Sequence, residues 1–381
     1  MFMDETPFGV LGHAIHGCLE RVEPGEGRVY LLKSYAGQNL PATHARPTFS
    51  EAWFHQNYGL KFGEKYYIDP ISRTEQDREA LRLLYDRFGQ AGIGEKDPRP
   101  RPNLEICGHR LISALFGCEI AYQDDQAPSA RHLSMSSAGE IAAIPRPDVA
   151  TNRWAQEFRR QAAILLDRYH AVDSIINHGG PINAASSILG SDALLYLSDA
   201  PAVMTGFLKV IADVCVESYD RLTVPFSPEM GATREMFIGN CPVIMMSPQT
   251  YRQAVLPADQ RLRSQVQRFG LHHCGVMDRY LETYKCLEPI EYLEVGWGTN
   301  LAAARRAFPT AIFDVMINIY DLQNMAQTTI REKVANMLEQ AQPVALVRDF
   351  FLADIGPDVP DAKVLEFIEA VDLAVAHCTH V

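Results

Sequence analysis

From residue 170 onward, short apolar runs alternate with longer stretches of helical periodicity, and this alternation limits the folds open to the chain more than any other feature. Such a pattern is typical of parallel strands joined by crossover helices. We predict strands at 172–177, 235–238, 271–273, 292–295, 311–317 and 344–347, with an early strand at 28–32.

Helical patterns fill the intervals between these strands. They predict helices at 184–197, 201–222, 248–269, 277–286, 299–307, 327–341 and 361–376, preceded by two more at 74–89 and 153–169. The first of the early pair ends on Gly89, a residue type that commonly follows a helix C-terminus. The proline- and charge-rich stretch 92–103 is predicted to be an exposed loop.

The number and order of these elements favour an α/β fold with a closed (β/α)8 barrel of the TIM type over a doubly wound sheet. A dinucleotide-binding doubly wound fold carries Gly-x-Gly-x-x-Gly after its first strand, and this loop is missing from the sequence. We expect one domain over residues 1–381, with the main barrel in residues 141–381. Residues 1–140 are expected to form an elaborated N-terminal extension that contributes to the barrel mouth. Active residues of such barrels lie at the C-terminal ends of strands, so those ends are the places to inspect.

Residues with metal-binding chemistry close three neighbouring strands. Residues two apart on a strand point to the same side, so His272 and Cys274 converge on one face while His273 points away. An imidazole and a thiolate on one face are half of a tetrahedral zinc site. Glu294, closing the next strand, could add a carboxylate oxygen, and Cys241, after the preceding strand, could add a second thiolate.

Each of these residues also has an ordinary structural interpretation. A lone histidine in a strand is commonly a hydrogen-bonded core residue, and a free cysteine commonly packs as a small hydrophobe. Glu294 could also serve as a base or as a hydrogen-bond acceptor. We predict a metal held by His272, Cys274 and Glu294, with Cys241 as a further candidate ligand. Other strand ends supply His178 and Arg348 as candidate catalytic residues beside Glu294, and Asn177, Gly180 and Asn240 as candidate cofactor-binding residues.

The charge of the chain argues against one class of partner. A formal net charge of −12 is opposite to the dense basic surface that a general nucleic-acid binder needs. The sequence has no apolar run of 18 residues, and its N-terminus lacks the basic start and apolar stretch of a secretory signal. We therefore expect a cytoplasmic protein that does not enter membranes; a homodimer is left open.

The same strand ends carry a resemblance to a known family. The run Leu271-His272-His273-Cys274-Gly275, the stretch Leu-Glu-Val-Gly-Trp-Gly-Thr-Asn (293–300) and Ala-Ala-Ala-Arg-Arg-Ala-Phe-Pro (302–309) resemble the C-terminal half of the uroporphyrinogen decarboxylase superfamily. Asn-His-Gly-Gly-Pro-Ile-Asn (177–183) is similar to that superfamily's Gly-Pro-containing strand end. The resemblance covers residues 170–375 and implies the same barrel.

One chemistry of that superfamily is decarboxylation of a tetrapyrrole, which is bound through an N-terminal Arg-Gln-Ala-Gly-Arg-Tyr-Leu-Pro segment. The similar segment here, residues 34–41, reads Ser-Tyr-Ala-Gly-Gln-Asn-Leu-Pro, with neutral residues in place of both arginines. Two bidentate clamps for carboxylates are therefore lost, which disfavours porphyrinogen decarboxylation.

The zinc- and corrinoid-dependent methyltransferases form a second branch, which this chain resembles more closely. They carry a His-x-Cys motif, which His272 and Cys274 match, and Glu294 falls where the similar site of cobalamin-independent methionine synthase has a metal-binding glutamate. The chain departs from the pattern at the last strand, where Val347-Arg348-Asp349 stands in place of a Cys-Gly. Cys241 and Asp349 are the candidate replacements for the missing thiolate.

The resemblance thus implies a methyltransferase that uses zinc and moves a methyl group between a small methylated substrate or thiol and a corrinoid (cobalamin). The sequence has no corrinoid-binding Asp-x-His-x-x-Gly segment, so the corrinoid would arrive on a separate protein. The alternative is a decarboxylase or lyase of a small carboxylic acid that uses His178, His272 and Arg348 in acid–base and carboxylate-binding roles. A third class, a ligand sensor on the same barrel, would bind a small molecule without turnover.

Overall fold

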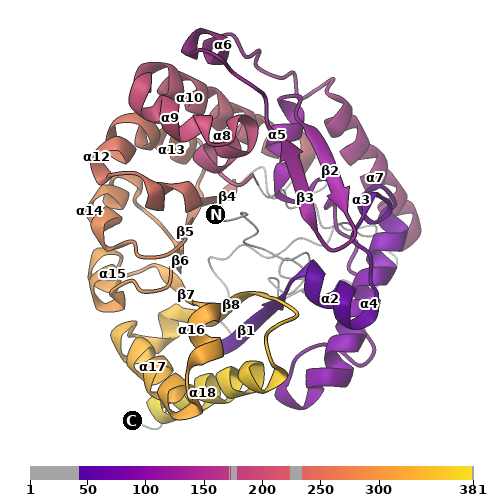
Figure 1. Cartoon of the computed structure of the whole chain (residues 1–381), viewed down its shortest axis with the longest axis vertical. Coiled ribbons are helices and arrows are strands. Elements are labelled where there is room, and N and C mark those ends of the chain that lie inside the picture. The colour runs from indigo at the N-terminus through magenta and orange to yellow at the C-terminus, as the bar shows by residue number, and fades with distance from the viewer. Residues whose placement is uncertain (1–42, 171, 173–177, 224–233, 380–381) are drawn as a thin grey trace.

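A computed structural model describes residues 43–170, 172, 178–223 and 234–379. Within them, one parallel sheet has the strand order β1-β8-β7-β6-β5-β4. Its strands are β1 (His44–Phe49), β4 (Glu235–Gly239), β5 (Arg268–His273), β6 (Tyr292–Val295), β7 (Ile312–Ile317) and β8 (Val347–Ile355). Helices join the successive strands from β4 to β8, so the fold is the predicted TIM-type α/β barrel. Figure 1 shows the strands on the inner side of the arc and the helices outside them.

The helices follow the predicted order. The N-terminal part contains α2 (Glu51–Tyr58), α3 (Glu64–Ile68), α4 (Pro70–Phe88), α5 (Leu111–Leu115), α6 (Ala138–Ala142) and α7 (Arg153–Tyr169). The barrel part contains α8 (Pro181–Leu189), α9 (Asp192–Asp199), α10 (Pro201–Ser218), α12 (Pro248–Thr250), α13 (Leu256–Arg263), α14 (Leu281–Tyr284), α15 (Leu301–Ala307), α16 (Ile319–Asn324), α17 (Gln327–Gln340) and α18 (Asp361–Thr379). None of the described helices is long and apolar enough to cross a membrane.

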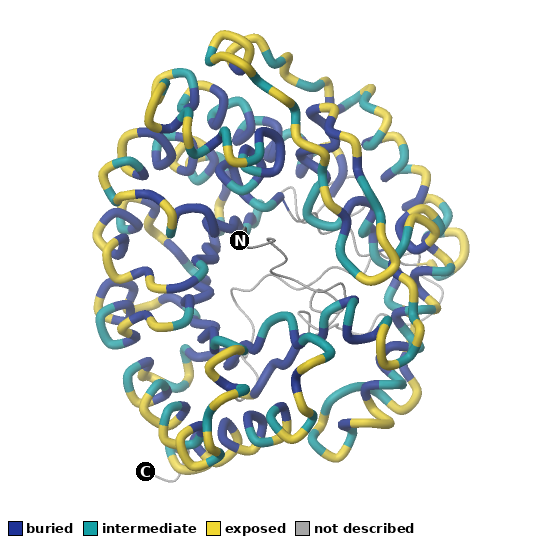
Figure 2. Tube along the Cα trace, viewed as in Figure 1, coloured by how far each residue is buried: buried dark blue, intermediate teal, exposed yellow. Residues whose placement is uncertain are grey.

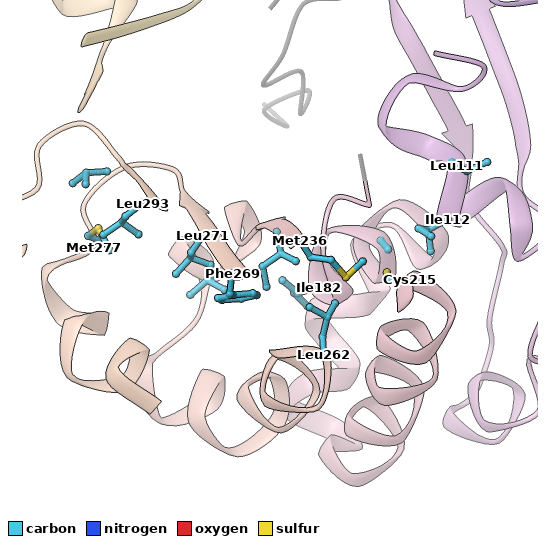
Figure 3. Close-up of a cluster of buried hydrophobic side chains, with 14 of the residues drawn as sticks. Leu111, Ile112, Ile182, Cys215, Met236, Leu262, Phe269, Leu271, Met277 and Leu293 are labelled. Atoms are coloured by element: carbon cyan, nitrogen blue, oxygen red, sulfur yellow. The ribbon is translucent and has the colours of Figure 1, made fainter. Parts of the chain in front are cut away.

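The core lies between the outer face of the sheet and these helices. Side chains alternate along a strand, so Phe269 and Leu271 of β5 point outward into the core, where both are buried, while His272 points into the barrel. Figure 3 shows Phe269 and Leu271 beside Met236 of β4 and Leu262 of α13. Figure 2 shows the strands and the inner faces of the helices as buried, with exposed residues on the outer helix faces.

The N-terminal part is built onto the same sheet. Phe49, at the end of β1, packs on Trp53 of α2 and Phe88 of α4, with ring centroids 4.4 and 5.3 Å apart. β1 pairs in parallel with β8. This strand was not predicted, because Arg46 and Pro47 interrupt its apolar pattern. The predicted strands 28–32 and 172–177 lie outside the described residues, apart from Val172.

Several predicted boundaries are wrong. The strand predicted at 344–347 is β8, which begins at Val347 and continues to Ile355 through Arg348, Asp349 and Asp354. The predicted helix 248–269 ends at Arg263, and β5 begins at Arg268. The predicted helix 184–197 is two helices, because Gly190 has a φ of 63° that ends α8. The antiparallel hairpin β2 (Glu119–Gln123) and β3 (Gln126–Arg131) was also missed.

Candidate metal centre

Two neighbouring strand ends bring one histidine and two cysteines together. Gly239 of β4 pairs with His272 of β5, and Cys241 and Cys274 follow these strands at the same edge of the sheet. Nε2 of His272 lies 2.9 Å from Sγ of Cys274, which lies 3.2 Å from Sγ of Cys241. The three ligand-type atoms all lie within 4.8 Å of one another. A single ion can be reached by all three side chains.

Glu294 lies on the other side of the imidazole. Its Oε2 accepts a hydrogen bond from Nδ1 of His272 at 2.7 Å, and its Oε1 accepts one from the hydroxyl of Tyr292 at 3.1 Å. Because Nδ1 is engaged in this way, Nε2 is the nitrogen that faces the thiols. The sequence predicted Glu294 as a ligand beside His272 and Cys274, with Cys241 as a further candidate. In the structure Glu294 engages Nδ1 of His272, and Cys241 is the residue grouped with His272 and Cys274.

Cys241 is held from helix α8. Its backbone N–H donates to Oδ1 of Asn183 at 3.1 Å, and Nδ2 of Asn183 lies 3.6 Å from its sulfur. Asn183 stands in the first turn of α8, directly after Pro181 begins the helix. Sequence reasoning missed this role, although Asn183 closes the Gly-Gly-Pro-Ile-Asn run that carries part of the family resemblance.

Buried electrostatics give the cluster an imidazolium–thiolate character. A hydrogen bond from Cys274 lowers the pKa of Cys241 well below its usual value; burial opposes this shift, and the charge of His272 reinforces it. Burial acts to lower the pKa of His272, but the thiolate of Cys241 and the carboxylate of Glu294 raise it to about 10. Burial acts to raise the pKa of Glu294, yet contact with His272 lowers it overall. These shifts favour the thiolate form of Cys241 and the protonated form of His272.

The donor set suits zinc. Zinc binds imidazole nitrogen and thiolate sulfur in tetrahedral sites, and softer thiolate ligands disfavour magnesium and calcium. The cluster supplies one such nitrogen and two sulfurs, and the lowered pKa of Cys241 favours its thiolate form. Cys241 is buried and Cys274 is partly exposed, so the site is reached from the side of Cys274.

Arg348 lies in a buried ionic cluster next to this centre. Its Nε donates to Asp314 at 3.0 Å, and its Nη2 donates to the hydroxyl of Tyr292 at 2.6 Å. Asp349, the other candidate for the missing thiolate, accepts from Nε of Arg46 at 2.5 Å and is absent from the three-residue group. Arg46 was not predicted as a site residue.

The side chains of Asn240 and His273 face away from the metal cluster, toward the helices outside the sheet. Nδ2 of Asn240 donates to Asp259 of α13 at 3.1 Å, so its side chain faces the helix layer. His273 likewise points away from the barrel interior, with Nδ1 2.7 Å from the hydroxyl of Tyr284.

The Gly-Gly-Pro segment that precedes α8 packs against strand β4. His178 is buried near Tyr219, with ring centroids 6.5 Å apart. A Cβ on Gly180 would come within 2.9 Å of the Gly239 carbonyl oxygen, so close packing on β4 accounts for this glycine. Asn177 lies outside the described residues.

Comparisons with known proteins show a family and a fold that the chain shares. The family model described as uroporphyrinogen decarboxylase (URO-D) matches residues 108–373. A solved methyltransferase from Methanosarcina mazei is 17% identical, with 90% of this chain and 94% of that chain covered and a TM-score of 0.57. A B12-independent methionine synthase from Shewanella sp. W3-18-1, in complex with selenomethionine, is 12% identical, with coverages of 90% and 98% and a TM-score of 0.41. No curated protein matches. At 17% identity, the first structure shows a shared fold.

Proposed function

Because this chain belongs to the uroporphyrinogen decarboxylase family, we propose that it is a metal-dependent methyltransferase of that family, with a zinc ion held by Cys241, His272 and Cys274. The observation that carries the proposal is the cluster of two thiols and one imidazole at the ends of β4 and β5. Catalytic zinc sites use three protein ligands and keep a further position for substrate or water. When bound, the ion would supply Lewis acidity that stabilises negative charge on a substrate thiol or oxygen, as methyl transfer at neutral pH requires.

The chain's own residues prepare this site. Glu294 fixes the imidazole ring by accepting from Nδ1, so Nε2 stays directed at the thiols. Asn183 holds the backbone of Cys241 and, through its amide, approaches the sulfur. The partial exposure of Cys274 leaves a side from which a small substrate can approach.

The ionic cluster argues against a polyacidic substrate. Glu294, Asp314 and Asp349 are buried carboxylates on β6, β7 and β8, and they engage Arg46 and Arg348. Both guanidinium groups are thus already matched with carboxylates of the protein, and a further carboxylate would meet repulsion. This favours methyl transfer over decarboxylation of a polyacid, in agreement with the neutral residues at 34–41.

The second substrate in this proposal is a corrinoid carried on a separate protein, and the first is a small methylated compound or thiol. We also propose that residues 1–140 contribute to the mouth of a single barrel domain whose main part is residues 141–381. The pairing of β1 with β8 supports that organisation.

Metal analysis combined with a methyl-transfer assay tests the function. The purified chain is incubated with free cob(I)alamin and a panel of methanol, methylamines and methyl thioethers, and methylcobalamin is followed by absorbance. We expect bound zinc and transfer from one class of compound, lost on chelation and restored by zinc. An enzyme that contains no metal and decarboxylates or cleaves a small acid would establish the lyase instead, and tight binding of a small molecule without turnover would indicate a sensor.

Zinc affinity is expected to rise with pH. The raised pKa of His272, about 10, means that its proton must leave before Nε2 can coordinate. Each pH unit gained between about 6.5 and 8.5 should therefore increase the apparent affinity about tenfold through this group alone. Competition with a chelator of known affinity measures the change.

The matched variant for this prediction is Glu294→Gln. It removes the carboxylate charge that supports the proton on His272, so the rise in affinity should level off at a lower pH than in the parent protein. An affinity that stays constant between about pH 6.5 and 8.5 would contradict coordination through His272.

A further inference from the structure

The guanidinium group of Arg46 on β1 connects the first strand with β6, β7 and β8, which lie near the C-terminal end of the sequence. Its Nε donates to Asp349 of β8 at 2.5 Å, and its Nη2 donates to Asp314 of β7 at 2.8 Å and to Glu294 of β6 at 3.3 Å. Its Cζ lies 3.8 Å from the ring centroid of Phe351. Arg46 is buried, so its orientation is fixed by these contacts.

Only one of these contacts leads directly to the metal centre. Oε1 of Glu294 accepts from Arg46 and lies 3.1 Å from the hydroxyl of Tyr292, whose single proton also faces Asp314, while Oε2 accepts from Nδ1 of His272. The two oxygens of one carboxylate therefore couple the ionic cluster to the imidazole. A carboxylate held at one oxygen keeps the other in a fixed direction, and this fixes the plane of the histidine ring.

Arg46 also lies outside the part of the chain that the family model matches, which begins at residue 108. The candidate metal ligands lie at the ends of β4 and β5, within the matched part. Arg46, which holds the carboxylate of Glu294 that orients His272, comes from β1. A lysine could supply the charge at this place, but its compact ammonium lacks the planar fork by which Nε and Nη2 of Arg46 reach carboxylates on three strands.

We propose that Arg46 is a positioning residue for the metal centre: together with Tyr292, it holds Glu294 so that His272 presents Nε2 to the two thiols. This inference rests on the proposed zinc site. Among the described residues, the hydrogen bond to Glu294 is what connects Arg46 to the metal centre, so Arg46 acts through that carboxylate.

Metal affinity and the spectrum of a cobalt-substituted protein test this role without relying on turnover. Zn2+ affinity is measured by chelator competition, and Co2+ is added to the metal-free chain so that its absorption reports ligand geometry. Arg46→Lys keeps the charge but loses the forked geometry, and Tyr292→Phe removes the hydroxyl that contacts Oε1 of Glu294 and Asp314, with little change of shape. Loss of such outer contacts typically weakens metal binding about 10- to 100-fold. We expect a loss near the lower limit for each variant, with an altered Co2+ spectrum.

The matched control is Arg73, another fully buried arginine. It donates to the carbonyl of Tyr67 at 3.0 Å and to the side chain of Gln161 at 2.9 Å, in the N-terminal part and with no described contact to the metal cluster. Arg73→Lys should lower thermal stability while zinc affinity and the Co2+ spectrum stay those of the parent.

The outcomes separate the two proposals. If the parent protein binds zinc and both Arg46→Lys and Tyr292→Phe bind it with unchanged affinity and spectrum, the positioning role is wrong and the zinc site stands. If Arg46→Lys does not fold, Tyr292→Phe alone decides in the same way. If the parent protein binds neither Zn2+ nor Co2+, the zinc site itself is wrong and the positioning role falls with it.

Discussion

Replacing Cys274 by serine is expected to abolish methyl transfer and to leave the purified protein without zinc, while the fold is kept. A serine hydroxyl is a poor anion at neutral pH, so the ion would lose a thiolate and the cluster would keep only Cys241 and His272. Cys274 is partly exposed, so the polar replacement should cost no more than about 1–3 kcal/mol of folding free energy. Zinc content after dialysis, methylcobalamin formation and thermal unfolding measure the three effects.

Cys215→Ser is the control for this prediction. Cys215 lies fully buried in α10, and Figure 3 shows it in the core near Met236 and Ile182. Burial raises the pKa of this thiol, which is the opposite of the shift at Cys241. Its serine variant should lose stability and keep zinc and activity. Full zinc content and equal activity in both variants would mean that Cys274 is an ordinary core residue, and the methyltransferase proposal would lose its main support.

The strands that carry the site were predictable in position and in face, although β5 begins at Arg268, three residues before its predicted start. β6 has the predicted bounds, and β7 begins one residue after its predicted start. On β5, the alternation of buried Leu271 with His272 is enough to direct the histidine into the barrel. Short apolar runs between helical stretches fix such elements locally, without knowledge of their neighbours.

β1 and β8 were harder to predict, because the charges on them are compensated only in the folded chain. Arg348 and Asp349 read as the end of an apolar run, yet both are buried next to Asp314 and Arg46. Asp349 and Arg46 are 303 positions apart in the sequence. A buried ion pair of this kind leaves no periodic signal in either segment. The apolar pattern therefore stops at the charged residue, although the strand continues past it.

The choice of ligand also depended on three-dimensional detail. Glu294 and Cys241 close the strands on either side of β5, and spacing along the chain treats them alike. The two residues differ in which nitrogen of His272 they face. Glu294 faces Nδ1, whereas Cys241 lies with Cys274 on the side of Nε2. Ring orientation follows from packing and hydrogen bonds across three strands, which a linear pattern does not contain.

Gly296→Ala is expected to destabilise the chain strongly and to displace the metal centre. Gly296 follows β6 and lies against the turn that carries Cys274. A Cβ at this position would come within 2.1 Å of the Gly275 carbonyl oxygen and 2.3 Å of the His273 carbonyl oxygen. Both neighbours are backbone atoms, so no side chain can rotate out of the way. Overpacking usually costs about 1–3 kcal/mol, and a backbone clash should reach or exceed the upper end of that range.

The displacement should be visible in zinc binding as well as in stability, because the turn must move and Cys274 moves with it. Gly206→Ala is the matched control: Gly206 lies in the middle of α10, is exposed, and has no atom within 4 Å of an added Cβ. Alanine there should stabilise the helix by up to about 1 kcal/mol and leave zinc binding unchanged. Denaturant unfolding and chelator competition on both variants measure the contrast. A Gly296→Ala protein as stable as the parent, with the parent's zinc affinity, would mean that the loop after β6 does not hold the turn that positions Cys274.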